Sequence, residues 1–236
     1  MKKYLSVLMI SMSAILLSCK KENLPKGESI SLIKSTTRNS EVVNYTYDNE
    51  GRCVQVDYNN GFVQKFEYQP GLVISKEFTN GVLTNEYHNE LNSDGNVIFR
   101  NSVNNPDYQV SYNYDNNQYV KSGNSKNTQI EYDYYYYWSN GNIDSVSRFK
   151  KNGEWLYSTH YTYYTDKMNS ISSIAMGQKF YGKQSKNLIK TQVTLNENGI
   201  IESHQISYEF DAKGRVIKMI DVLNGLPSWT KIFSYQ

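Results

Sequence analysis

The sequence predicts an all-β fold, a single antiparallel meander of about 15 or more short strands that is strongly curved or barrel-like. Runs rich in Val, Ile, Tyr, Phe and Thr alternate with turn signals from residue 28 to residue 236. Asn-Gly pairs recur between the runs, as at 60–61, 80–81, 140–141 and 224–225. Asn-Gly indicates a hairpin because a type I′ turn needs positive φ at both central residues. Aromatic residues form 14% of the chain and supply buried area for folding.

Residues 1–18 have the organisation of a signal peptide and are not expected to belong to the fold. Lys2 and Lys3 precede an apolar run at 4–17 that is too short to span a bilayer stably. The stretch LLSC at 16–19 resembles the lipobox of bacterial lipoproteins. That resemblance implies cleavage before Cys19 and acylation of Cys19, and several acyl chains would hold the protein durably on a membrane. The alternative is an ordinary secretory signal followed by a chance cysteine.

The expected domain organisation follows from this N-terminus. Residues 19–27 hold the lipidated cysteine and a polar linker, and residues 28–236 form a single all-β domain. We expect an exported protein that is lipid-anchored to the bacterial outer membrane, on its periplasmic or its cell-surface side. The sequence does not choose between the two sides, and it predicts no oligomeric state.

Charge and cysteine content exclude some classes of function. Residues 1–18 contain two lysines and no acids, so the remaining chain has 25 − 2 = 23 basic and 23 acidic residues. A neutral chain lacks the basic surface that nucleic-acid binding requires, so no nucleic acid is expected as partner. After Cys19 only Cys53 remains, and it has no disulfide partner. We interpret Cys53 as a small apolar core residue rather than a reactive thiol, because Val216 occupies the equivalent position of a later repeat.

Two units share the pattern Tyr-x-x-Asp-x-x-Gly-Arg, at 45–52 and 208–215. The Asp of each unit is expected at the first position of a tight turn, where its carboxylate accepts the backbone N–H two residues on. The Gly then takes the left-handed conformation, and the Arg opens the next strand. The pattern therefore predicts hairpins. It does not match a calcium-binding loop.

These units also carry a family resemblance. The segments YTYDNEGRCVQV and YEFDAKGRVIKM resemble the YD repeats of Rhs-type proteins, whose long arrays form a hollow β-shell around a toxin. This chain has only two good copies and too few strands to enclose a cargo domain. It is more similar to an uncharacterised family of bacterial lipoproteins with YD-like hairpins that is described as porin-like in fold, and GKQSKNL at 182–188 also resembles that family. The resemblance implies a fold and no activity.

The distribution of apolar residues over the two strand faces points to a curved sheet. Strict alternation places Val54, Val56 and Tyr58 on one face and Cys53 on the other. The stretch YDYYYYW at 132–138 has aromatic residues on both faces, which suits a sheet that curls around a lumen. The strand NIDSVSRFK lacks the apolar band that a lipid-facing barrel strand needs. We therefore expect a barrel-like sheet that does not span the membrane.

The connection at 166–187 is longer and more irregular than the others. We expect a short β-like piece at 171–175, followed by a segment with two glycines and three lysines. Long connections in compact domains are often functional. An equally good interpretation is a plug or cap over an open end of the sheet.

No catalytic, cofactor or metal motif is present in the sequence. The histidines His88, His160 and His204 each lie inside a predicted strand, and we interpret them as ordinary strand residues. We therefore expect no cofactor and no metal. A hydrolase with an unusual site near 166–187 remains an alternative, since acids and hydroxyls are plentiful.

The aromatic strands are the best functional lead. The possible ligand contacts are Tyr134, Tyr136, Trp138, Tyr161 and Tyr163. Their rings offer flat apolar area with a polar tip, as sugar and protein contacts do, although the rings could instead fill the interior of the curved sheet. We expect a non-enzymatic envelope lipoprotein with a binding or scaffolding role, whose ligand is a glycan or an envelope protein. A third hypothesis is a structural Rhs-like wall fragment, which predicts self-association.

Overall fold

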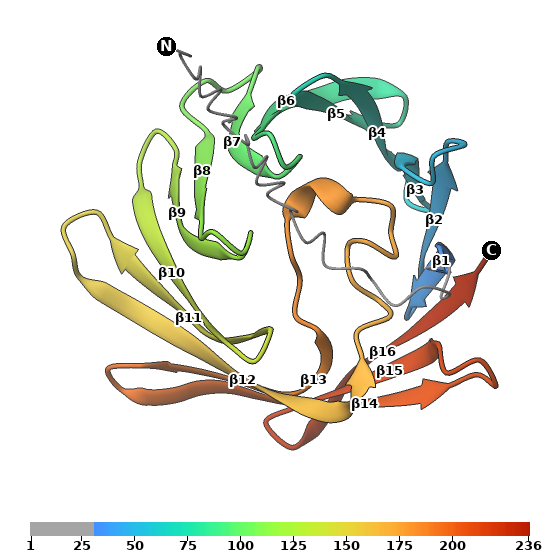
Figure 1. Ribbon diagram of the computed structural model, residues 1–236, viewed down its shortest axis with the longest axis vertical. Helices are drawn as coiled ribbons and strands as arrows, with labels where there is room; N and C mark the ends of the chain where they lie inside the picture. The colour runs from blue at the N-terminus through green and yellow to red at the C-terminus, as the bar shows by residue number, and fades with distance from the viewer. Residues whose placement is uncertain (1–30) are drawn as a thin grey trace, which may run out of the picture.

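The computed structural model describes residues 31–236, which form sixteen strands and one short 3-10 helix (Figure 1). Each strand pairs antiparallel with the next, and the first strand also pairs with the last, so that the sheet closes into a barrel. The all-β meander with a barrel-like sheet is thus confirmed. The segments 1–18 and 19–27, with the predicted signal peptide and Cys19, lie outside the described residues. Within residues 31–236 no helix is long and apolar enough to cross a membrane.

The strands follow one another without crossovers. They are β1 (Ile33–Arg38), β2 (Glu41–Tyr47), β3 (Cys53–Tyr58), β4 (Phe62–Gln69), β5 (Leu72–Thr79), β6 (Val82–Leu91), β7 (Val97–Ser102), β8 (Gln109–Tyr114), β9 (Val120–Lys126), β10 (Glu131–Ser139), β11 (Asn142–Lys150), β12 (Trp155–Met168), β13 (Asn187–Asn196), β14 (Gly199–Phe210), β15 (Val216–Leu223) and β16 (Leu226–Tyr235). The 3-10 helix η1 (Lys179–Tyr181) lies in the connection from β12 to β13.

The turns of the two Tyr-x-x-Asp-x-x-Gly-Arg units have the predicted geometry. Oδ1 of Asp48 accepts the backbone N–H groups of Glu50 and Arg52, both at 2.9 Å, and Oδ2 accepts Nε of Arg52 at 2.7 Å. Gly51 takes the left-handed conformation with φ of +72°. The second unit repeats these contacts at the same distances. The repeated pairing of an acid with an arginine therefore stabilises the turn itself.

Register shifts after the turns change which residues face inward. Tyr47 pairs with Cys53 whereas Thr46 pairs with Gln55, so Val54 is passed over at the start of β3. The predicted alternation, which placed Cys53 opposite to Val56, is therefore wrong, and both residues are buried on one face. Burial raises the pKa of the Cys53 thiol to about 12, which favours its interpretation as a core residue.

The segment 169–186, which we call the plug, folds into the interior of the barrel (Figure 1). Its main chain bonds to the strand starts, since Ile33 donates to the Ala175 carbonyl at 2.9 Å and Cys53 donates to the Gly177 carbonyl at 3.1 Å. The β-like piece expected at 171–175 is absent, because the chain there forms consecutive turns, such as the bond from the Ala175 N–H to the Ser172 carbonyl. Of the two interpretations of this connection, the contacts favour the plug.

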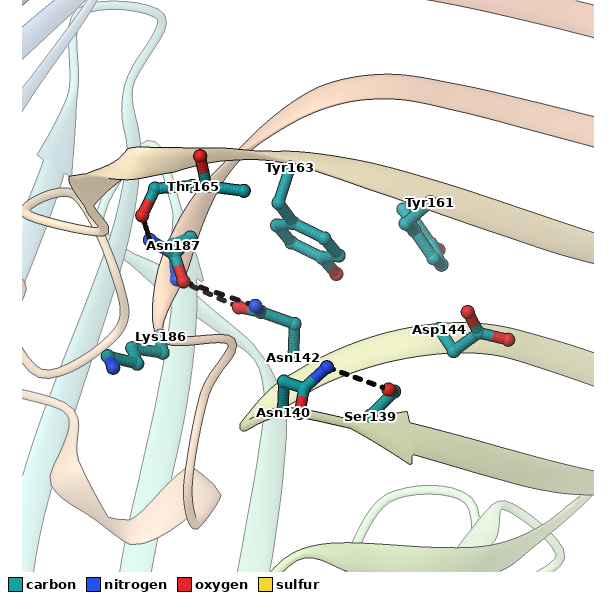
Figure 2. Close-up of a pocket in the computed structure, with 9 residues that line it drawn as sticks. All are labelled: Ser139, Asn140, Asn142, Asp144, Tyr161, Tyr163, Thr165, Lys186 and Asn187. Atoms are coloured by element: carbon teal, nitrogen blue, oxygen red, sulfur yellow. Dashed lines mark hydrogen bonds between the residues drawn. The ribbon is translucent and has the colours of Figure 1, made fainter.

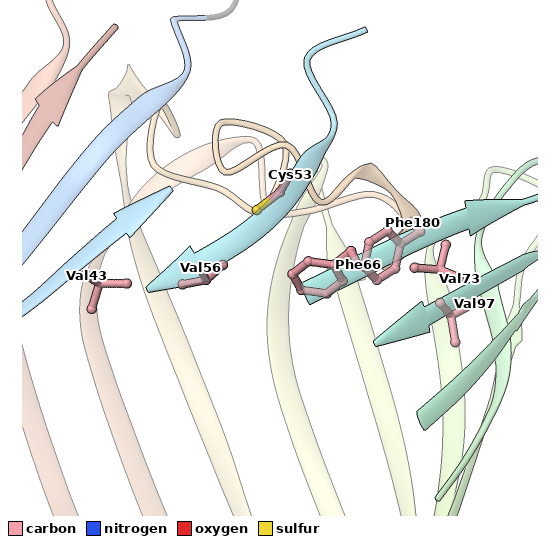
Figure 3. Packing of buried hydrophobic residues seen from close by; sticks show 7 residues of the cluster. All are labelled: Val43, Cys53, Val56, Phe66, Val73, Val97 and Phe180. Carbon is pink, nitrogen blue, oxygen red and sulfur yellow. The ribbon is translucent and has the colours of Figure 1, made fainter. Parts of the chain in front are cut away.

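The buried apolar residues gather where the plug meets the wall. One cluster consists of Val43, Cys53, Val56, Phe66, Val73, Val97 and Phe180 (Figure 3). A second consists of Ile33, Ala175, Leu188, Val216 and Phe233. Many of these residues begin odd-numbered strands, so the core lies at the end of the barrel where those strands start. We call this the plug end and the opposite end the far end.

A ring of side-chain hydrogen bonds surrounds the plug end. Every even-numbered strand sends one side chain to a main-chain carbonyl near the start of the preceding strand, at distances from 2.5 to 2.9 Å. The donors are Tyr47, Tyr68, Asn89, Tyr114, Trp138, Tyr163, Tyr208 and Tyr235. Because each bond ties two neighbouring strands at the same height, the ring fixes the register of the closed barrel there.

Candidate ligand-binding site

A pocket of about 390 Å³ opens on the inner wall where strands β10 to β12 meet the end of the plug (Figure 2). It is lined by Ser139, Asn140, Asn142, Asp144, Tyr161, Tyr163, Thr165, Lys186 and Asn187. The volume lies within the range of small-molecule sites in proteins. Every lining side chain carries a polar group, and the two tyrosine rings are the largest apolar surfaces of the pocket.

One part of the lining is held rigidly by its own hydrogen bonds. Asn142 and Asn187 bond twice, from Nδ2 of Asn142 to Oδ1 of Asn187 at 3.1 Å and from the Asn187 N–H to Oδ1 of Asn142 at 2.9 Å (Figure 2). The Tyr163 hydroxyl donates to the Ile143 carbonyl at 2.7 Å. Because Asn142, Asn187 and the Tyr163 hydroxyl already have hydrogen-bond partners, they fix the shape of the pocket, and a ligand would bind to the remaining lining groups.

The other part of the lining has polar groups that no described residue satisfies. Within residues 31–236 the Asp144 carboxylate, the Tyr161 hydroxyl and the Lys186 ammonium form no hydrogen bond or ion pair. Burial, followed by the neighbouring Tyr163 and Tyr157, raises the pKa of Tyr161 to about 12, so its hydroxyl remains a donor at neutral pH. The Lys186 side chain points away from Tyr161 and Asp144 (Figure 2), so the pocket offers an acceptor, a donor and a ring face to a ligand.

The five aromatic residues predicted as ligand contacts all lie on the inner wall. Tyr161 and Tyr163 line the pocket, on β12. Tyr134 and Tyr136 lie on β10 beside it, and burial raises the pKa of Tyr136. Trp138 has a structural role, because its ring packs on Tyr119 with centroids 4.5 Å apart and its Nε1 donates to the Val120 carbonyl at 2.7 Å.

Sequence reasoning missed Asp144 and Lys186. Asp144 lies at a register shift in β11, between Ile143 and Ser145, which are paired with consecutive residues of β10. Strict alternation does not predict where such a residue points. Lys186 is the last residue of the plug, and its N–H donates to the Gly141 carbonyl at 2.9 Å, a contact between distant parts of the sequence.

The histidines do not converge on one site. His88 on β6 bonds Glu86 at 3.0 Å, and His160 on β12 is exposed. His204 on β14 faces inward, and its Nδ1 lies 2.9 Å from the buried Asp221 carboxylate. Among residues 31–236 no group of three or more His, Cys, Asp and Glu side chains could hold a metal ion.

The plug itself offers little acid–base chemistry. Residues 169–186 contain no Asp, Glu or His, so a hydrolase site there would have to take its acid and base from the wall. The wall also leaves no strand edge unpaired, because β1 pairs with β16. Edge-to-edge assembly, as expected for a wall fragment, would require this closed sheet to open.

Comparison with solved structures supports the fold. A porin-like protein from Bacteroides uniformis matches with a TM-score of 0.62 and 13% identity over 88% of this chain and 98% of the other. A porin-like protein from Bacteroides vulgatus matches with a TM-score of 0.62 and 12% identity over 87% and 99% of the two chains. No protein-family model matches, and no curated protein does. The porin-like architecture is thus shared at low sequence identity.

Proposed function

We propose that this protein is a non-enzymatic binding protein of the bacterial cell envelope, and that its ligand is a glycan held on the inner wall of the barrel. The observation that carries the proposal is the pocket, in which the unpaired Asp144 carboxylate and Tyr161 hydroxyl stand beside two tyrosine rings. Sugars present hydroxyl groups that both donate and accept, together with flat apolar C–H faces. A ring beside mixed donors and acceptors suits both features.

Attachment through acylated Cys19 remains part of this proposal. The porin-like neighbours support an envelope location, and the outer wall supports a barrel that lies beside the bilayer. Its outer face has hydroxyl pairs, such as Ser147 with Ser158 at 2.7 Å and Thr162 with Thr191 at 2.7 Å. A wall in contact with lipid tails would need apolar side chains there. Loss of palmitate incorporation in Cys19→Ser cells would support the anchor, and unchanged incorporation would contradict it.

A glycan array tests the binding function. The purified protein is applied to neutral and acidic glycans, and each retained glycan is then titrated by calorimetry. We expect Tyr161→Ala and Asp144→Asn to weaken binding about tenfold, because each removes a ligand contact. Tyr135→Ala on the outer face is the matched control and should bind normally, since Tyr135 is 44% exposed and points away from the pocket. Retention of no glycan, or equal losses in the inner and outer variants, would refute the proposal.

A further inference from the structure

The arginines of residues 31–236 fall into two groups. Those in the turns at the plug end form ion pairs with aspartates, as Arg52 does with Asp48 and Arg215 with Asp211. The others lie farther along the inner wall, where Arg100 still reaches Tyr181 of the plug, and none has a carboxylate within ion-pair distance among these residues. They are Arg38, Arg100 and Arg148.

Each inner arginine is instead stacked on an aromatic ring. Arg38 lies 4.6 Å from the ring centre of Trp229, Arg100 lies 4.0 Å from that of Tyr87, and Arg148 lies 3.6 Å from that of Tyr132. Stacking holds a guanidinium in place without neutralising its charge. Burial and the nearby Arg38 also lower the pKa of Lys231, another cation of this wall. Glu41, which lies opposite Arg38 across β1 and β2, acts in the other direction on Lys231, so the charge on this side of the wall is partly balanced.

Arg148 has the most aromatic rings around it, three in all. Tyr134 and Tyr157 flank its guanidinium at 5.5 and 5.6 Å, and its Nη1 donates to the Tyr157 hydroxyl at 3.0 Å. Its buried Nε has no acceptor among residues 31–236. A guanidinium has five N–H donors, so most of those of Arg148 have no acceptor in the part of the chain that the structure describes. Such a fork, fixed by rings, suits the oxygen atoms of a carboxylate or sulfate.

The position of Arg148 connects it to the pocket. Arg148 pairs with Tyr157 across β11 and β12, and the pocket residues Asp144 and Tyr161 lie four positions along the same two strands. Four residues of strand span about 13 Å. A ligand of more than one sugar ring could therefore contact both places. The Asp144 carboxylate would repel an acidic group, which orients such a ligand with its charge toward Arg148.

We propose that Arg148 binds the carboxylate or sulfate group of an acidic glycan, whose next sugar occupies the pocket at Asp144 and Tyr161. The inference rests on the proposed glycan-binding function and adds the class of ligand. The tyrosines around Arg148 then have two roles. They fix the orientation of the guanidinium, and they keep carboxylates of the protein away from it.

The test compares wild-type protein with Arg148→Gln on the same glycan array, with uronate-bearing, sulfated and neutral glycans as separate arms. We expect wild-type protein to prefer acidic glycans, and Arg148→Gln to lose that preference about tenfold while neutral binding stays within twofold. Arg148→Lys keeps the positive charge and loses the paired N–H donors of the guanidinium, so its preference for acidic glycans should lie between those of wild-type protein and Arg148→Gln. Arg215→Gln is the control, because Arg215 is already paired with Asp211 in a turn.

A second measurement does not depend on glycans. Inorganic sulfate is titrated into ¹⁵N-labelled protein while the arginine Nε–H signals are recorded, and the Arg148 signal should move saturably while that of Arg215 does not. Equal binding of acidic and neutral glycans, or an acidic preference that survives Arg148→Gln, overturns the inference and leaves the proposed function standing. A sulfate response at Arg148 with no glycan retained overturns the proposed function and leaves an anion site.

Discussion

The two ends of the barrel are built from different kinds of residue. At the plug end the odd-numbered strands begin with buried apolar residues such as Ile33, Cys53, Val97 and Val216, which pack on the plug. Toward the far end the same inner wall carries stacked arginines, tyrosines and the buried Asp221 with His204. The apolar plug end can thus supply most of the stability of the fold. The far end can then hold charged side chains that a ligand could contact.

Closure of the sheet makes this division possible. A closed barrel has no edge to protect, and its hydrogen bonds alone connect every strand. The core needs to fill only part of the interior, and the plug supplies the side chains that do so. Phe180 reaches Phe66 and Tyr68 with ring centroids 6.0 and 6.2 Å apart. On this division, most of the stability belongs to the plug end.

The largest expected effect is alkaline unfolding. Burial raises the pKa of Tyr45 and Tyr114 to about 12, and it also raises the pKa of Tyr47, Tyr68 and Tyr208. Because these folded-state pKa values lie above the ordinary value of 10, the stability they represent is present below pH 10 and is lost as the pH rises. We expect cooperative unfolding between about pH 10 and 12, seen by circular dichroism together with tyrosinate absorbance. Tyrosinate absorbance that rises at a pH well below the pH of unfolding would contradict this prediction.

Truncation of the plug should have the next largest effect. Phe180 is 4% exposed, and Phe180→Ala leaves a cavity among aromatic rings, so we expect a loss of about 4 kcal/mol in the free energy of unfolding. Phe149→Ala is the control, because Phe149 lies on the outer face against Tyr135 and should cost about 1 kcal/mol. Urea unfolding measures the free energy of unfolding of both variants. Equal losses would mean that the plug does not hold the core together.

The fit of the plug against the wall is tested by two glycines with similar backbone angles. Gly177 has φ of +69°, and a Cβ there would lie 2.6 Å from the Cys53 nitrogen and 2.9 Å from the Gly51 carbonyl oxygen. Gly71 has φ of +72° and nothing within 4 Å of such a Cβ. We expect Gly71→Ala to cost about 1 kcal/mol for the left-handed backbone alone and Gly177→Ala about 3 kcal/mol. Similar denaturation midpoints for the two variants would contradict a close contact.

The sequence predicted what depends on neighbouring residues. The Asn-Gly turns at 80–81, 140–141 and 224–225 have positive φ at both residues, as a type I′ turn requires. The pair at 60–61 differs, because only Gly61 has positive φ. The Asp-capped turns were also predicted, with the bond to the N–H two residues on and the left-handed Gly, although the bonds from the Asp to the Arg were not.

What the sequence did not predict depends on distant contacts. The register shift that turns Cys53 inward requires the partner strand, and the hydrogen bonds between the plug and Cys53 join segments far apart in the chain. The Arg148 site requires three strands, because its rings come from β10 and β12. The sequence singled out the aromatic residues as functional candidates. Whether a given ring packs in the core or is available to a ligand depends on its position along the barrel axis. That position is set by the register of the closed sheet and cannot be read from neighbouring residues.

The smallest expected effect compares one hydroxyl at each end. The Tyr208 hydroxyl donates to the Ile189 carbonyl at 2.9 Å in the ring at the plug end, and burial raises its pKa. Tyr208→Phe removes the donor and leaves that carbonyl without its partner, so we expect a loss of about 1 kcal/mol in the free energy of unfolding. Tyr157→Phe removes the hydroxyl that accepts from Arg148 toward the far end, where water can replace it, and should cost less than about 0.5 kcal/mol. Urea unfolding of both variants gives the two losses in the free energy of unfolding. A larger loss for Tyr157→Phe would place part of the stability in the arginine-lined wall, and that wall would then have a structural role that competes with ligand binding.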